Sequence, residues 1–382
     1  MEVKPGYKLT EVGVIPEDWE VLPLAATVDF LDGQRRPVND NDRAKVRGDI
    51  PYYGASGIVD YVDNFIFDDT LILLGEDGEN ILSRNCRLAF IISGKAWVNN
   101  HAHVLKPRHG YDIGFLAEYL ESLEYEQYNT GTAQPKLNKQ VCSKIPVLRP
   151  PLPEQTAIAT ALSDVDSLIS SLDALISKKK QIKQGAMQEL LSGKRRLPGF
   201  SGEWEVKRLG DVAPLQRGFD LPTTQIKPGT YPVVYSNGVL NHHSAYQVKG
   251  PGIITGRSGT IGKVTIINED YWPHNTSLWV TSLKGNDVLF VYYLFICIEL
   301  ERFATGSGVP TLNRNDVHEY SVTLPPLPEQ QAIAAILSDM DAEITTLESR
   351  RNKTKLLKQG MMQELLTGRI RLIPPAAHAV SA

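Results

Sequence analysis

Residues 150–169 read PPLPEQTAIATALSDVDSLI, and residues 325–344 read PPLPEQQAIAAILSDMDAEI. Each stretch leads into a second shared segment, KQGAMQELLSG in the first copy and KQGMMQELLTG in the second. The copies are offset by 175 residues without a gap, and 28 of the 48 positions in residues 150–197 are identical in residues 325–372. A long-period repeat dictates the architecture of a chain. The sequence therefore predicts a molecule built from two similar halves.

Each copy has the features of one long helix. Pro151 and Pro326 stand where a helix can begin, a glutamate follows in the first turn, and Gly193 and Gly368 stand where it can stop. Between them, apolar residues recur in steps of four and three, which is typical of a helix that pairs with another helix. They are Ile158, Leu162, Val165, Ile169, Leu172 and Ile176 in the first copy, and Ile333, Leu337, Met340, Ile344 and Leu347 in the second.

The apolar seam holds for roughly three heptads and is then interrupted, because Lys179 and Thr354 occupy its next positions. It resumes out of phase at Ile182, Ala186 and Leu190, and in the second copy at Leu357, Met361 and Leu365. About 39 helical residues at 1.5 Å rise form a rod of roughly 58 Å, which no small domain buries alone. We expect the copies to bury each other as an antiparallel pair, with the intervening segments at opposite ends of the rod. The alternative is that each helix packs only on its own domain.

Composition and charge are those of a globular protein. A chain of 382 residues is long for one hydrophobic core, so we expect two or three domains. The 3 cysteines have no metal or redox spacing, no apolar run reaches the ~18 residues of a membrane span, and the N-terminus lacks a hydrophobic signal, so we expect a cytoplasmic protein. The net charge is −4, and residues 1–149 alone carry 16 − 22 = −6. Because affinity for DNA comes largely from neutralised phosphates, this chain alone is expected to bind DNA weakly.

The segments before the two helices, residues 1–149 and 199–324, share one pattern. Both contain short β-branched and aromatic runs broken by Gly, Asp and Asn, which predicts strands joined by many loops. The offset of 175 also relates Trp97 to Trp272, and the motif TGTAQPKLNK to TGSGVPTLNR. Elsewhere the likeness weakens, as expected for one scaffold with different loops. The predicted fold is α+β, with two α/β domains separated by two long antiparallel coiled-coil helices in a pseudo-twofold repeat, and with residues 373–382 disordered.

These motifs resemble those of the specificity subunits of type I restriction-modification systems. The resemblance rests on the doubled PLPEQ helix, the QELL helix ends, the IPEDWEV start and the TG...P.LN segment before each helix, and it covers nearly the whole chain. It implies that residues 1–149 and 199–324 are target recognition domains, each reading one half of a split sequence in double-stranded DNA. It implies that residues 150–198 and 325–372 are the spacer and dock two methyltransferase subunits, which restriction subunits join. S-adenosylmethionine, ATP and magnesium would then be held by the partners, and this chain would carry no cofactor.

Base recognition needs polar and cationic side chains on loops that reach the DNA grooves. In the first domain the candidates are Gln34, Arg35, Arg36, Asn80, Asn99, Asn100, His101, Gln134, Lys136 and Asn138. In the second they are Gln216, Arg217, Arg257, Ser258, Thr260, His274, Asn275, Thr276, Asn313 and Arg314. For each residue a solvated or capping role is the alternative. For the repeated TG...P.LN segment the alternatives are a connecting turn and a phosphate contact.

The repeated helix surfaces are the candidates for partner binding. Two equal faces around a pseudo-twofold axis would bind two copies of one partner. The predicted contacts are Gln155, Gln188, Glu189, Gln330, Gln363 and Glu364. An ordinary solvated helix face is the alternative.

No segment carries a recognisable catalytic motif. Residues 256–264, GRSGTIGKV, resemble a P-loop but have Arg257 where glycine is required and Val264 where Ser or Thr is required. His101 and His103 lack a Cys or carboxylate at metal-ligand spacing, and no nucleophile motif is present. We therefore predict a non-catalytic subunit without a metal site. The alternatives are a single-chain enzyme that modifies or cleaves DNA, and a structural coiled-coil scaffold.

Overall fold

The computed structural model describes residues 3–306 and 308–374. By its internal contacts the chain divides into unit 1, Met1–Leu172 with Arg350–Ala382, and unit 2, Asp173–Ser349. The C-terminal tail predicted to be disordered is residues 373–382. Of these, residues 375–382 lie outside the part of the chain that the structure describes. No helix within the described part is long and apolar enough to cross a membrane.

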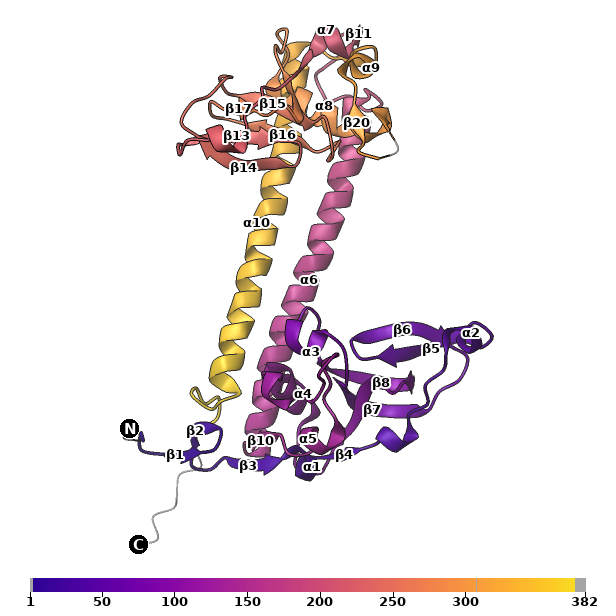
Figure 1. The fold of residues 1–382 in the computed structure, drawn as a ribbon, viewed down its shortest axis with the longest axis vertical. Helices are drawn as coiled ribbons and strands as arrows, with labels where there is room; N and C mark the ends of the chain where they lie inside the picture. Colours follow the sequence, from indigo (N-terminus) through magenta and orange to yellow (C-terminus); the bar gives the residue numbers. More distant parts are fainter. Residues whose placement is uncertain (1–2, 307, 375–382) are drawn as a thin grey trace. The chain divides into compact units, whose positions relative to one another are not determined.

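The two predicted long helices are present (Figure 1). α6 spans Leu152–Leu191 and α10 spans Leu327–Leu365. Gly193 and Gly368 follow their last turns, and both have a φ of 71°, the left-handed conformation that commonly ends a helix. The division between the units falls inside both helices. Each unit therefore contains one globular part, the first part of one long helix and the last part of the other.

In each unit the start of one long helix packs against the end of the other. Leu162 of α6 shares the core of unit 1 with Leu365 of α10, and Leu337 of α10 shares the core of unit 2 with Leu190 of α6. Both cores also contain residues of the globular parts, such as Phe115 in unit 1. Each helix is therefore buried both by the other helix and by its own globular part, which excludes the alternative that each helix packs only on its own domain.

Ion pairs fix the direction of the helices within each unit. In unit 1, Lys358 Nζ lies 2.6 Å from Asp166 Oδ2, and Arg371, beyond the end of α10, lies 2.6 Å from Glu154 in the first turn of α6. Residue numbers rise along one helix as they fall along the other, which confirms the predicted antiparallel pairing. The equivalent pairs in unit 2 are Lys183 with Asp341 and Arg196 with Glu329.

The predicted second phase of the apolar seam is wrong at two positions. Ile182 is 48% exposed and Leu357 is 58% exposed. The inward positions of these turns are taken by Lys183 and Lys358, whose side chains are only 17% and 12% exposed. Both lysines form ion pairs with an aspartate of the other helix, so charge pairing replaces apolar packing in these turns.

The globular part of unit 1 is built on one six-stranded sheet in the order β4-β9-β7-β8-β5-β6. All neighbours in it are antiparallel except β5 and β8. Its elements are β1 (Tyr7–Thr10), β2 (Gly13–Pro16), β3 (Glu20–Pro23), α1 (Leu24–Thr27), β4 (Val28–Phe30), η1 (Asp32–Gln34), α2 (Asp40–Arg43), β5 (Arg47–Gly54), β6 (Gly57–Val62), β7 (Phe67–Gly75), α3 (Asn80–Ser83), β8 (Ala89–Val98), β9 (Ala102–Pro107), α4 (Ile113–Ser122), η2 (Glu126–Tyr128), α5 (Lys139–Cys142) and β10 (Pro146–Arg149).

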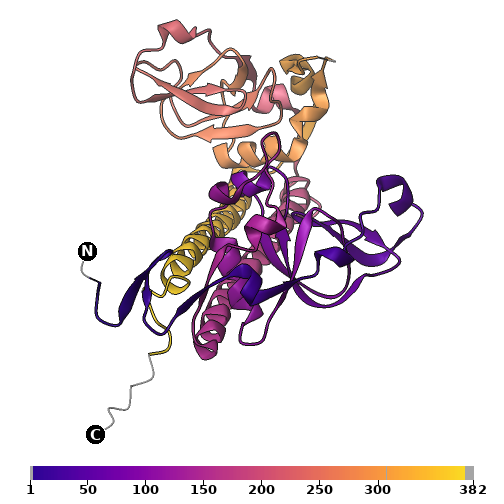
Figure 2. The same ribbon diagram turned by 60° about the horizontal axis from the view of Figure 1, so that its bottom comes forward.

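The N-terminal segment of unit 1 joins the end of α10. The β1–β2 hairpin lies beside this helix end (Figure 2), and Tyr7 Oη donates to Gly368 O at 3.1 Å. Ile15 and Trp19 enter the same core as Leu366. The first domain is therefore completed by residues more than 340 positions away in sequence.

Unit 2 repeats this plan with its sheet divided in two. β12-β18-β15-β16 form one sheet and β14-β13-β17 another, because the single strand β8 of unit 1 corresponds to the separate strands β16 and β17. Its elements are β11 (Glu205–Arg208), α7 (Leu209–Val212), β12 (Leu215–Arg217), η3 (Thr223–Gln225), β13 (Tyr231–Tyr235), β14 (Gly238–His243), β15 (Gly252–Gly256), β16 (Val264–Ile267), β17 (Trp272–Pro273), β18 (Ser277–Val280), α8 (Val288–Ile298), η4 (Leu300–Phe303), β19 (Ala304–Thr305), β20 (Thr311–Leu312), α9 (Arg314–His318) and β21 (Ser321–Leu324).

Candidate nucleic-acid interface

One glycine-bounded turn in unit 1 joins loops that are far apart in sequence. It is formed by residues 75–78, GEDG, at the end of β7. Glu76 N donates to His101 O at 2.8 Å, and Leu137 N donates to Glu76 O at 2.7 Å. The turn thereby holds the loop before β9 on one side and the TG...P.LN segment on the other. Two clusters of predicted DNA contacts, residues 99–101 and 134–138, are brought together in this way.

The corresponding turn of unit 2 has the same backbone frame. It is formed by residues 256–259, GRSG, at the end of β15. Arg257 N donates to Thr276 O at 2.8 Å, and Leu312 N donates to Arg257 O at 2.8 Å. The two globular parts therefore present the same turn between the same pair of loops.

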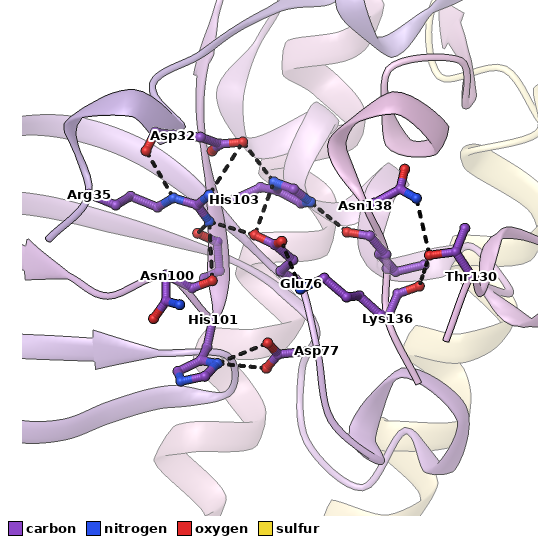
Figure 3. Close-up of polar contacts among 12 residues, drawn as sticks. Asp32, Arg35, Glu76, Asp77, Asn100, His101, His103, Thr130, Lys136 and Asn138 are labelled. Carbon is purple, nitrogen blue, oxygen red and sulfur yellow. Dashed lines mark hydrogen bonds and ion pairs between the residues drawn. The ribbon is translucent and has the colours of Figure 1, made fainter. Parts of the chain in front are cut away.

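The side chains around the turn of unit 1 neutralise one another (Figure 3). Glu76 Oε2 accepts from Arg35 Nη1 at 2.7 Å, and Lys136 Nζ lies 3.5 Å from Glu76 Oε1. The Asp77 carboxylate accepts from His101 Nδ1 at 2.9 Å. Arg35 also donates to three backbone carbonyls, those of Asp32, Asn100 and Ala102, so its guanidinium is held within the unit. The structure gives the predicted DNA contact Arg35 an internal role.

His103 lies behind this network and is almost fully buried. Its Nδ1 is 2.8 Å from Asp32 Oδ2 and its Nε2 is 2.7 Å from Leu137 O. Both partners are acceptors, so both ring nitrogens carry protons and the ring is an imidazolium. Burial opposes this charge, but hydrogen bonds with Asp32 and Cys142 outweigh it and raise the pKa of His103 to about 10. This arrangement gives His103 a structural role.

The charges at the matched positions of unit 2 are inverted. Asp32 and Arg35, which follow β4, form an ion pair at 3.9 Å. Arg217, the last residue of β12, forms one with Asp220 at 3.4 Å, with the signs exchanged. Arg257 stands where unit 1 has a glutamate. Among the described residues, the guanidinium of Arg257 has no hydrogen-bond or ion-pair partner. Unit 2 therefore has an uncompensated cation where unit 1 has a compensated anion.

Three predicted asparagine contacts in unit 1 close turns instead. Asn80 forms two hydrogen bonds with the backbone of Cys86, at 2.8 and 3.0 Å. Asn99 is buried and accepts from His101 N at 2.8 Å. Asn138 caps helix α5. For these residues the structure supports the capping alternative, whereas the exposed candidates, whose DNA contacts stay predictions, are Gln34, Arg36, Asn100, His101, Gln134 and Lys136.

The predicted residues of unit 2 fall into two groups by their exposure. His274 stacks on Tyr235 with ring centroids 4.2 Å apart, and burial lowers its pKa below the ordinary value. Asn275 donates to Asp220, and Asn313 caps helix α9. The half-buried candidates are Arg257, Ser258, His274, Asn275 and Thr276, and the exposed ones are Gln216, Arg217, Thr260, Asn313 and Arg314.

The predicted partner contacts also divide into buried and exposed side chains. Gln155 and Gln330 are buried: their Oε1 atoms accept from Asp112 N at 2.9 Å and Asp287 N at 3.0 Å, at the starts of α4 and α8. Their Nε2 atoms donate to backbone carbonyls. The prediction that these two side chains face a partner is therefore corrected to an internal role. Of the remaining candidates, Gln188, Glu189 and Gln363 are exposed and Glu364 is half-buried.

A repeated polar clamp at the helix starts was not singled out from the sequence. Glu154, 1% exposed, accepts from Trp19 Nε1 at 3.0 Å and from Arg371 Nε at 2.6 Å. Unit 2 repeats it with Glu329, Trp204 Nε1 at 3.3 Å and Arg196 Nε at 2.6 Å. The matched tryptophans and the 175-residue offset between the arginines were the signal in the sequence. The networks at Asp32, Glu76 and Asp77 had no such signal, because their partners lie far apart in the chain.

A groove of about 430 Å³ in unit 2 lies between α6, α8 and α10. The predicted partner contact Gln188 lines it, with Lys183, Met187, Cys297 and Asp341. Within the part of the chain that the structure describes, no three His, Cys, Asp or Glu side chains are grouped so that they could hold a metal ion.

Comparison with known families gives two matches along the chain. Residues 16–184 and residues 201–356 each match the family described as type I restriction modification DNA specificity domain. Each matched segment covers one globular part and much of the long helix that follows it.

Similar proteins carry related names. A putative type I restriction enzyme specificity subunit of Haemophilus influenzae is 28% identical over 354 residues, which is 85% of this chain and 87% of that protein. The type I restriction enzyme MjaVIII specificity subunit of Methanocaldococcus jannaschii is 23% identical, with 94% of both chains covered.

Solved structures show the same fold. The crystal structure of a type I restriction-modification system S subunit from M. genitalium superimposes with a TM-score of 0.63 at 15% identity, over 94% of this chain and 98% of that one. A chain from a structural study of complex assembly in the type I restriction-modification system has a TM-score of 0.55 at 14% identity, over 93% and 99%.

Proposed function

This chain belongs to the type I restriction modification DNA specificity family, and from that premise we propose that each unit reads one half of a bipartite DNA sequence. The chain is the DNA specificity subunit of a complex that contains other subunits. The long helices, which both run from one unit into the other, set the unread gap between the half-sites.

The observation that carries the proposal is that units 1 and 2 share one backbone arrangement but differ in the side chains that it presents. The turns at residues 75–78 and 256–259 bind equivalent loops through hydrogen bonds of nearly equal length. The side chains on the loops that these turns hold differ: His101 and Lys136 in unit 1 stand where unit 2 has Thr276 and Thr311. Groups that differ in charge and in hydrogen-bonding capacity recognise different base edges. Two units with the same backbone and different side chains suit the recognition of two different half-sites.

The partner surface in this proposal is the repeated ends of the long helices. Gln188 and Glu189 in α6 correspond to Gln363 and Glu364 in α10, and these side chains face outward or lie half-buried. In unit 2, Gln188 lines the groove that Cys297 also lines. Two equivalent surfaces of this kind suit two copies of one methyltransferase subunit, to which restriction subunits are added.

We assign the chemistry to those partners. The sequence contains no recognisable catalytic or cofactor motif, so in this proposal S-adenosylmethionine, ATP and magnesium belong to the methyltransferase and restriction subunits. The rival enzyme hypothesis is tested by incubating the purified chain alone with duplex DNA and S-adenosylmethionine. Methyl transfer by the chain alone would support that rival.

A domain exchange tests the bipartite reading. Residues 199–324 are replaced by the corresponding domain of another family member, and the methylated sequences are mapped in cells that contain the methyltransferase. We expect one half of the methylated site to change while the other half and the gap stay the same. The matched control replaces residues 1–149 and should change only the other half. A change of both halves in either chimera would refute the assignment of one half-site to each unit.

A further inference from the structure

The turn of unit 2 presents hydrogen-bond donors whose acceptor is not supplied by the unit. The Arg257 guanidinium is half-buried and has no partner among the described residues. The exposed hydroxyl of Thr260 follows three residues later. Gly256 fixes the turn, because a Cβ there would lie 1.7 Å from Thr260 O. A rigid turn with a free cation is suited to bind an anion that comes from outside the unit.

Unit 1 offers the opposite arrangement on the same frame. Its Glu76 carboxylate is held by Arg35 at 2.7 Å and Lys136 at 3.5 Å. Unit 2 has Asp220 at the position of Arg35, but Asp220 pairs with Arg217 and accepts from Asn275 instead. The uncharged Thr311 stands at the position of Lys136, so among the described residues no equivalent network forms around Arg257. The difference lies in the side chains alone, because the backbone hydrogen bonds of the two turns agree.

Resting on the proposed function, we propose that Arg257 binds a phosphate of the DNA backbone, and that unit 1 has no such contact at the equivalent turn. A charged hydrogen bond to phosphate is shorter and stronger than a neutral one. Half to two-thirds of protein–DNA hydrogen bonds reach phosphate and sugar, and they position a protein without reading bases. A position held by backbone bonds that both units share suits this positioning role better than a base-reading one. Unit 2 then supplies more of the salt-dependent affinity than unit 1.

The test measures DNA affinity against salt concentration with the complex of this chain and its methyltransferase. The wild-type methylated sequence is mapped first, and a duplex with that site is titrated by fluorescence anisotropy. For Arg257→Gln we expect the slope of log K against log salt to fall by about one and the affinity to fall on the order of tenfold. Arg257→Lys keeps the charge and should keep most of the slope. The methylated sequence should be that of the wild type in both variants.

The control is Arg208→Gln, which removes an equal charge from an exposed side chain of β11 that is 2.9 Å from Glu319. It should leave the slope unchanged. An unchanged slope for Arg257→Gln overturns the phosphate contact, and a changed methylated sequence overturns it in favour of base reading. If Arg257→Gln lowers the melting temperature, the salt slope of Arg257→Lys decides instead. A slope for Arg257→Lys that falls as far as that of Arg257→Gln, after subtraction of the Arg208→Gln effect, counts against phosphate binding. If the wild-type complex methylates DNA without preference for any two-part sequence, the proposed function itself is refuted. This outcome is distinct from a failure of the Arg257 proposal.

Discussion

Arg371 connects the segment after α10 to the first domain through hydrogen bonds to Glu154 and Asp18, so its removal is expected to destabilise unit 1. Its guanidinium donates to Glu154 through Nε at 2.6 Å and Nη2 at 2.7 Å, and to Asp18 at 2.9 Å from both terminal nitrogens. Burial opposes its charge, but the bonds with Glu154 and Asp18 outweigh burial and raise the pKa of Arg371 above its ordinary value. The arginine is therefore a permanent cation at this site.

Arg371→Ala leaves the Glu154 carboxylate, which is 1% exposed, with the Trp19 indole as its one side-chain donor among the described residues. Removing one partner of a buried ion pair costs about 3–5 kcal/mol. In a unit of this size each kcal/mol lowers the melting temperature by about 2–4 °C, so we expect a decrease of roughly 10 °C. Arg196→Ala in unit 2 leaves Glu329 in the same position but breaks no second ion pair. Its effect should be somewhat smaller.

Differential scanning calorimetry measures the decrease, and hydrogen exchange of residues 15–24 locates it in unit 1. The control is Arg369→Ala, because this exposed side chain lies 3.6 Å from Glu364 and such surface pairs contribute about 0–1 kcal/mol. The double variant Glu154→Leu with Arg371→Leu should recover most of the stability, since apolar residues replace buried ion pairs with little loss. Equal effects of Arg371→Ala and Arg369→Ala would refute the clamp.

Two further predictions concern buried residues. The folded-state pKa of His103 is about 10, above its ordinary value of 6.5, so its stabilising effect is complete below pH 6.5 and is lost as the pH rises towards 10. The melting temperature of the wild type should therefore fall between pH 6 and pH 10. An equally steep fall in His103→Leu would contradict this. Leu162→Lys and Leu337→Lys place a charge in cores where both leucines are fully buried, and each should cost several kcal/mol in denaturant unfolding. Leu356→Lys, at a position 68% exposed, is their control and should change little.

The DNA-contact candidates show where sequence reasoning reaches its limit. The sequence selected loops of the right chemistry, and the structure brings most of them to one turn in each unit. From the sequence alone, Arg35 could not be separated from Arg257. Arg35 is bound to Glu76 forty-one positions away, whereas Arg257 has no partner in the part of the chain that the structure describes. Whether an arginine is free depends on neighbours that only the folded chain assembles.

The seam residues show the same limit in the helices. Leu162 and Leu337 were identified by their spacing, because a helix places every third or fourth side chain on one face. Spacing also assigned Ile182 to that face, although the structure turns it outward and Lys183 inward. An apolar pattern does not reveal that a lysine will meet an aspartate of the other helix.

The sequence by itself determined the doubling of the chain, the two long helices and the family, because these follow from repeated motifs and from local periodicity. Only the tertiary structure decided which polar side chains are free to meet a ligand, where Glu154 and Glu329 are clamped, and that the two turns carry opposite charge. The physical reason is that electrostatic compensation joins side chains far apart in the chain, such as Arg371 and Glu154, which are 217 positions apart. Such pairs exist only once the backbone has brought them within hydrogen-bonding distance.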